Sequence, residues 1–207
     1  MSYKFEIEGG STVKFLVGGK YCDRDIEVTA KGGGGSTDIE DGLITRTLTE
    51  YSNERVTSVG VCAFQSFSTL QSVNLPNVTR IGAKAFNSCS ILKRVVLPKL
   101  TEIQPGDNFT YCYALEYVDL AFAYRIPSWC LANCPKLETI ILRKSDSICT
   151  LQATNGLSGT LVANGTGYVY VPAALVDEYK AATNWSTYAN QIRAIEDYPE
   201  ICGEVSA

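Results

Sequence analysis

Apolar residues recur at a fixed period through the middle of the chain. The pattern Leu-x-x-Val/Ile-x-Leu ends at Leu75, Leu97, Leu120 and Leu142, at spacings of 22, 23 and 22 residues. Apolar positions two residues apart mark a short strand with one buried face, and copies of one strand at a constant period stack as a parallel sheet. The pattern therefore predicts an α/β-type solenoid of about four coils over residues 56–142, in which each coil buries its apolar face against its neighbours.

A second set of apolar positions predicts the opposite wall of each coil. Two columns are expected to stack along this wall from one coil to the next: Val59, Ile81, Ile103 and Ile126, and beside them Phe64, Phe86, Phe109 and Leu131. Pro76 and Pro98 directly follow two of the strands. Because proline has no backbone N–H to offer to a ladder, these residues are expected to end the pairing and turn the chain.

Three of the eight cysteines occupy one position of the repeat. Cys89, Cys112 and Cys134 stand where the first copy has Phe67. A position that accepts either Cys or Phe is an apolar core site, and a free Cys behaves there as a small hydrophobe. We expect three buried thiols and no metal site, since the chain contains no His.

The segments before the repeats have a different pattern. Residues 1–31 alternate apolar and polar residues with period two, interrupted by glycine pairs, which predicts a small N-terminal β module. Residues 32–37 are a Gly-rich linker by composition, and residues 38–148 are expected to hold the solenoid with its entry segment. A sheet as small as residues 1–31 needs a partner for stability, so we expect this module to anchor the protein to a larger assembly.

Residues 149–207 are expected to form a C-terminal helical cap. A last strand is predicted near residues 168–171, a helix after Pro172, and a second short helix near residues 188–195. The open end of a parallel sheet invites pairing with other chains, so a cap is needed on physical grounds.

Composition and charge narrow the choice of partners. Hydrophobic residues make up 45% of the 207, and the net charge is −4. Nucleic-acid binding needs clustered Lys and Arg, so we expect no nucleic-acid partner. The N-terminus has no basic start followed by an apolar run, and no stretch approaches the ~20 apolar residues of a membrane span. We therefore expect synthesis in the cytoplasm without a signal peptide, and no membrane span.

No enzyme motif is found in the chain. The absence of His excludes the Ser-His-Asp and Cys-His arrangements, and the glycines at 32–35 are not followed by the Lys of a phosphate-binding loop. A carboxylate pair on the sheet face, Glu116 with Asp119 or Glu138, is the only remaining arrangement that could support glycosidase chemistry. Charges exposed on a strand are usually only a solvated face. We predict no enzymatic activity and no cofactor.

The candidate binding residues point outward between the buried Leu and Val positions. They should form two columns on the sheet face: Ser72, Arg94, Tyr117 and Thr139, and beside them Asn74, Val96, Asp119 and Ile141. A mixture of Arg, Tyr and exposed aliphatic groups is typical of recognition surfaces. We therefore select as binding residues Arg94, Tyr117, Asp119, Val96 and Ile141. A solvated face without a partner is the alternative interpretation.

A turn beside the fourth copy is a second candidate surface. Tyr124, Arg125 and Trp129 make this stretch rich in aromatic and cationic side chains. The alternative is that these residues pack within the fourth coil, where the repeat pattern lapses.

The repeat motif resembles a known family. The consensus I-G-x-x-A-F-x-x-C-x-x-L-x-x-V-x-L-P, intact at residues 81–98, resembles the BspA-like leucine-rich repeats of bacterial surface and gut-associated proteins. The resemblance covers about residues 56–142, although the fourth copy has Pro127 and Leu131 where Gly and Phe are usual. It implies a short right-handed leucine-rich repeat stack and, often, adhesion, and it implies no catalytic residues.

The flanks lead to a hypothesis about location. Residues 19–30 and 168–192 resemble segments that accompany these repeats in gut Firmicutes and in phage or prophage virion proteins. The leading hypothesis is a non-enzymatic virion protein that displays the solenoid to a protein or cell-surface glycan. The alternative is a bacterial cell-surface adhesin of the BspA-like type whose signal peptide has been removed.

Overall fold

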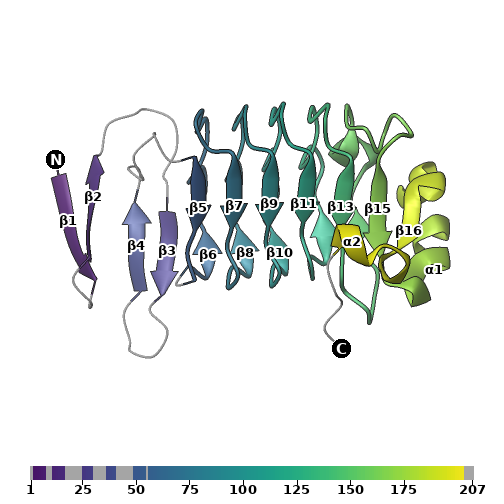
Figure 1. Cartoon of the computed structure of the whole chain (residues 1–207), viewed down its shortest axis with the longest axis horizontal. Coiled ribbons are helices and arrows are strands. Elements are labelled where there is room, and N and C mark those ends of the chain that lie inside the picture. The colour runs from purple at the N-terminus through teal and green to yellow at the C-terminus, as the bar shows by residue number, and fades with distance from the viewer. Residues whose placement is uncertain are drawn as a thin grey trace.

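A row of short parallel strands forms the centre of the molecule (Figure 1). The computed structural model describes residues 2–7, 11–16, 25–29, 36–40, 49–54 and 56–202. The seven-stranded main sheet has the order β16-β15-β13-β11-β9-β7-β5. Its strands are β5 (Glu50–Ser52), β7 (Ser72–Asn74), β9 (Arg94–Val96), β11 (Tyr117–Asp119), β13 (Thr139–Ile141), β15 (Tyr168–Val171) and β16 (Ile192–Ala194).

The register of this sheet confirms the predicted stack and extends it at both ends. Val73, Val95, Val118 and Ile140 lie opposite one another on successive parallel strands. Before them, Tyr51 pairs with Val73, and after them Val169 pairs with Ile140. β15 is the strand expected near residues 168–171. The repeat motif does not reveal β5, because Tyr51 stands where Val is usual.

The opposite wall consists of two-residue strands. β6 (Ser58–Val59), β8 (Arg80–Ile81) and β10 (Glu102–Ile103) form one sheet, while β12 (Arg125–Ile126) and β14 (Thr150–Leu151) form another. The predicted column therefore pairs from Val59 to Ile103 and is interrupted before Ile126. The interruption coincides with the one-residue insertion at Gly106 and Asp107, where Gly106 has a φ of +121° that favours glycine.

Aromatic rings and thiols fill the space between the walls. The rings of Phe64, Phe86 and Phe109 stack with centroid distances of 5.0 and 5.2 Å, and each pair is within 4° of parallel. Cys89 and Cys112 are free and fully buried, and each Sγ donates to the carbonyl of the Phe one coil earlier, at 2.9 and 3.1 Å. Cys134 makes the same bond to Phe109 at 3.1 Å, so the predicted column of buried thiols is confirmed.

Gly82 of the motif is required by a close approach of two coils. A Cβ at this position would lie 2.5 Å from the backbone N of Val61 and 2.6 Å from the carbonyl carbon of Gly60. Any other residue would push the coils apart at this point.

Two antiparallel hairpins precede the stack. β1 (Ser2–Ile7) pairs with β2 (Ser11–Leu16), and β3 (Asp25–Thr29) pairs with β4 (Ser36–Glu40). Strand β4 contains the last two residues of the expected linker, and residues 32–35 of that linker lie outside the described residues. β3 lies beside β6, at the start of the solenoid. The anchoring role of residues 1–31 stays a prediction.

The C-terminal cap takes the place of a further coil. It contains the 3-10 helix Ala173–Leu175, α1 (Val176–Ala181), the 3-10 helix Trp185–Gln191 and, after β16, the 3-10 helix Ile195–Asp197 and α2 (Pro199–Cys202). The helix expected near residues 188–195 ends at Gln191, because Ile192 instead pairs with Val169 at the edge of the main sheet. No helix of the described residues is long and apolar enough to cross a bilayer.

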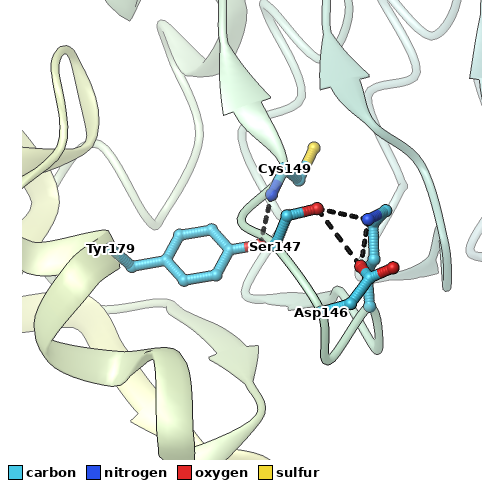
Figure 2. Close-up of polar contacts among 5 residues, drawn as sticks. Asp146, Ser147, Cys149 and Tyr179 are labelled. Carbon is cyan, nitrogen blue, oxygen red and sulfur yellow. Dashed lines mark hydrogen bonds and ion pairs between the residues drawn. The ribbon is translucent and has the colours of Figure 1, made fainter.

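Side chains of the cap complete the hydrogen bonding of the last coil. The hydroxyl of Tyr179 accepts a bond from the N–H of Cys149 at 2.7 Å (Figure 2), and the indole N–H of Trp185 donates to the carbonyl of Cys149 at 2.6 Å. Asn184 donates to the carbonyl of Leu151 at 2.8 Å, and Tyr188 donates to that of Thr154 at 2.9 Å. Four side chains of the cap thus form the hydrogen bonds that a further coil would otherwise make to the backbone N–H and carbonyl groups of the last coil.

Candidate functional site

The outer face of the main sheet presents the two predicted columns in register. Arg94 lies between Ser72 and Tyr117, and Val96 lies between Asn74 and Asp119. The columns continue through Thr139 and Ile141 to β15. The spacing of the repeats therefore positions the candidate residues as expected, and their surroundings decide which of them a partner can reach.

Arg94 and Tyr117 form the accessible centre of this face. Arg94 is exposed, and its guanidinium carbon lies 3.6 Å from the centroid of the half-buried Tyr117 ring. Burial raises the pKa of Tyr117 and the charge of Asp119 adds to the rise, while Arg94 and Arg143 oppose it. The phenol is therefore a neutral donor at physiological pH, beside a fixed positive charge. Val96, half-buried, adds an apolar contact next to them.

Asp119 is held in an ion pair within the protein. Its carboxylate is bound by the Nη2 and Nε atoms of Arg143 at 2.7 and 3.0 Å, and it accepts the N–H of Ala121 at 3.1 Å. Only 3% of the residue is exposed. Arg143 follows strand β13 at the point where the first two copies have proline. Asp119 therefore offers little to an external ligand, and it cannot pair with Glu116 as a free catalytic carboxylate.

Ile141 is covered by the end of the chain. It is fully buried in a cluster with Tyr170 and Ile195, and Tyr117, Tyr168, Tyr198 and Ile201 pack around that cluster. The ring of Tyr198 meets the ring of Tyr170 edge-on at 5.3 Å. In Figure 1, α2 lies in front of the strands at this end of the sheet. We call residues 195–201 the C-terminal strap, because they cover the part of the face to which Ile141 belongs.

The three turn candidates do not form one group. The guanidinium carbon of Arg125 lies 5.7 Å from the ring centroid of Tyr124, which is exposed. Trp129 follows strand β12 and is also exposed, and in the part of the chain that the structure describes no ring contact joins it to Tyr124 or Arg125. Packing in the fourth coil does not account for Tyr124 and Trp129, since both remain about half exposed.

Two exposed tyrosines were missed by the sequence analysis. Tyr111 and Tyr113 lie on the turn that leads from the second wall of the third coil back to the main sheet, and both are exposed. The preceding copy has Ser88 and Ser90 at these positions, and the following copy has Asn133 and Pro135. A comparison of outward positions among the copies, in addition to the inward ones, would have found them.

A Ser–Lys–Asp cluster lies near the cap (Figure 2). The ammonium of Lys144 donates to the carboxylate of Asp146 and to the hydroxyl of Ser147, and the Lys144 bond lowers the pKa of Asp146. These three side chains are hydrogen-bonded to one another on a surface loop. No group of three potential metal ligands occurs among the described residues.

One family model and two solved structures were found to be similar to parts of this chain. The family model described as BspA type leucine rich repeat region, with six copies, matches residues 47–153. A leucine rich cell surface protein from Faecalibacterium prausnitzii A2-165 is 18% identical, with a TM-score of 0.41, over 84% of this chain and 49% of its own. A leucine-rich repeat protein from Bacteroides ovatus ATCC 8483 is 16% identical, with a TM-score of 0.27, over 73% of this chain and 54% of its own.

The extent of these matches differs between the comparisons. The chain spans about half the length of the two solved structures, and no curated protein matches it. The family model covers more than half of the chain, from the strand before the first recognised copy to the last strand of the second wall. The chain therefore belongs to the BspA-type leucine-rich repeat family.

Proposed function

We propose that this chain is a non-enzymatic binding module of a bacterial surface protein, and that it contacts a protein partner through the open half of its sheet face. The observation that carries the proposal is the accessible Arg94 guanidinium stacked on Tyr117. Arg and Tyr are among the residues that contribute most to protein interfaces. Because the ring already holds the guanidinium in place, little side-chain entropy is lost on binding.

The composition of the open half favours a protein partner. Arg94 supplies a charged donor for a carboxylate or a backbone carbonyl, Tyr117 supplies a ring edge and a hydroxyl, and Val96 supplies apolar area. Such a mixture of aromatic, cationic and aliphatic groups is common at the centre of protein interfaces. Asp119 is not part of the contact surface, because its buried carboxylate is paired with Arg143.

A role at the cell surface fits this family better than a role in a phage particle. Neither the family model nor the two similar structures is described as a virion protein. The virion hypothesis rested on the resemblance of the flanks alone, and it gains no support from the comparisons. Surface adhesion, the alternative drawn from the repeats themselves, is the interpretation that we carry forward.

Two matched variants test the sheet face. Arg94→Ala and Arg193→Ala each remove a guanidinium from a tyrosine ring, since Arg193 lies 4.5 Å from the ring centroid of Tyr168 in the covered half. Binding of the purified chain to a panel of immobilised extracellular-matrix proteins is measured by biolayer interferometry. We expect Arg94→Ala to weaken binding by more than about 1 kcal/mol, roughly fivefold or more, and Arg193→Ala to change it less than twofold.

The result decides between the two halves of the face. Equal losses in the two variants, or no binding of the unchanged chain to any panel member, would contradict the proposed site. Location is tested separately by treating intact cells of the producing bacterium with trypsin. Cleavage of the chain from outside supports a surface protein, whereas full protection in intact cells and recovery of the chain in sedimentable phage particles would restore the virion hypothesis.

A further inference from the structure

Three exposed aromatic rings line one edge of the third and fourth coils. Tyr111, Tyr113 and Trp129 are 44, 53 and 48% exposed, and the ring centroids of the two tyrosines lie 6.2 Å apart. Trp129 belongs to the adjoining coil, where its carbonyl accepts a bond from the hydroxyl of Thr110, the neighbour of Tyr111. We call these three residues the aromatic ridge, and we propose that the ridge binds a neutral carbohydrate.

The backbone shows that an aromatic side chain is not needed for folding at Tyr111. Tyr111 and Trp129 have φ angles of +66° and +62°, in the left-handed region that bulky residues seldom adopt. A non-glycine residue there costs about 1 kcal/mol or more. At the position of Tyr111, the other coils have Ser66, Ser88 and Asn133, all with positive φ. Small polar residues thus build the same turn, so the Tyr111 side chain adds strain and exposed apolar area that the fold does not require.

The polar groups in the columns of the two tyrosines are neutral, whereas the column of Trp129 contains Lys84 and Asp107. Ser88 and Asn133 flank Tyr111 in its column, and Ser90 precedes Tyr113 in the next column. Neither column contains a charged residue in the coils between residues 66 and 159. Within the described residues, the hydroxyls of Tyr111 and Tyr113 have no hydrogen-bond partner. Free hydroxyls and amides beside flat rings suit a ligand that offers many hydroxyls and no charge.

The geometry favours a sugar chain over a protein. Tyrosine and tryptophan present an apolar ring with a polar tip, which matches a pyranose with its apolar C–H face and its hydroxyl rim. Protein hot spots lie in packed, desolvated pockets at the centre of an interface, whereas these rings stand on an exposed turn edge. The inference is independent of the sheet-face site, which involves other residues.

The neighbouring coils supply the test variants. Tyr111→Asn and Tyr113→Ser introduce the residues that Asn133 and Ser90 provide at the same columns, so the backbone of the turn already accepts them. Because asparagine adopts the left-handed region more readily than tyrosine, Tyr111→Asn is expected to keep or raise the melting temperature. Ser66→Asn, at the same column in a distant coil, is the matched control.

Binding is measured on an array of neutral and sialylated oligosaccharides. The chain has two tryptophans, of which Trp129 is exposed and Trp185 is fully buried, so iodide quenching of fluorescence reports on the ridge. We expect the unchanged chain and Ser66→Asn to bind neutral oligosaccharides and to protect Trp129 from iodide. The Tyr111→Asn/Tyr113→Ser variant should bind about tenfold more weakly or not at all, at an unchanged or higher melting temperature.

Four results would overturn the proposal: no oligosaccharide bound, preference for the sialylated members, equal binding by the double variant, or a clear loss of stability in that variant. Weaker binding of the double variant to the matrix-protein panel, with no effect on the array, would assign the ridge to a protein partner instead. The array and the matrix panel probe different residues, so failure of one leaves the other result standing.

Discussion

The two halves of the outer sheet face share one backbone and differ in what covers them. In the half near β7 and β9, Ser72 and Arg94 are accessible and no segment of the described chain packs over them. In the half near β13 and β15, Ile141 and Tyr170 belong to the column that begins with Asn74 and Val96, and both are buried beneath the C-terminal strap. Identical strand pairing therefore does not make equivalent surfaces. The side chains and the strap decide which half can meet a partner.

The boundary between the halves is an ion pair. Asp119 is the last polar member of its column before Ile141, and Arg143 reaches it from the strand beyond. A carboxylate with only 3% exposure would be unfavourable without this partner. The ion pair thus allows the open half and the covered, apolar half to adjoin on one face of the sheet.

The covered half depends on the cap, so loss of Trp185 is expected to have the largest effect. The side chain is fully buried, meets the ring of Tyr179 edge-on at 5.5 Å and donates to Cys149. Trp185→Ala should lower the free energy of unfolding by about 4 kcal/mol, measured by urea denaturation. Hydrogen exchange should accelerate in β14 and β15 more than in β7. Thr187→Ala, an exposed neighbour, is the control, and equal acceleration along the whole stack would show that the halves are not separable.

Removing Arg143 is expected to break the boundary. Arg143→Ala leaves the Asp119 carboxylate buried without its partner, at a cost of about 3 kcal/mol. Asp119→Asn in the same chain should restore part of the loss, because the buried charge is then absent. Lys144→Ala, which removes the neighbouring exposed ion pair, should have no measurable effect. A small loss in Arg143→Ala would mean that water reaches Asp119.

Loosening the C-terminal strap should make the two halves more alike. Tyr198→Ala removes the ring that packs on Tyr170 and is expected to cost about 1–2 kcal/mol, because Tyr198 is only partly buried. Tyr170 and Ile141 should become accessible, which increased binding of a hydrophobic dye would detect. Tyr198→Phe keeps the ring and should behave like the unchanged chain. Unchanged dye binding in Tyr198→Ala would show that Ile195 and Ile201 suffice as a cover.

Both halves of the sheet face lie over the same column of buried thiols. The pH dependence of stability tests the contribution of these thiols. Burial raises the pKa of Cys134 from 9.0 to about 12 and also raises that of Cys112. The unfolded chain therefore releases these protons first, so stability is complete below about pH 9 and falls as the pH rises towards 12. At pH 10 the loss from Cys134 is about 1 kcal/mol. Cys134→Ala should reduce the slope, which separates the thiols from the tyrosines that also titrate there. Identical slopes would contradict the prediction.

Much of the fold and part of the site follow from the repeat period. The period predicts the Phe64–Phe86–Phe109 stack, the thiol column and the neighbourhood of Arg94 and Tyr117, because equivalent residues of successive coils must lie side by side. It does not predict the Asp119–Arg143 pair, since Arg143 stands outside the motif. It does not predict Tyr111 either, since the equivalent positions hold Ser66, Ser88 and Asn133.

The sequence by itself determined the stack of coils: each coil has an apolar face that only another coil can bury, and the constant spacing leaves one way to align them. Only the tertiary structure decided which outward residues are available. Ile141 and Arg94 point the same way from equivalent strands, yet the strap returns from the end of the chain to cover the first and not the second. Burial depends on contacts between residues distant in sequence, and the spacing of residues within the repeats does not specify these contacts.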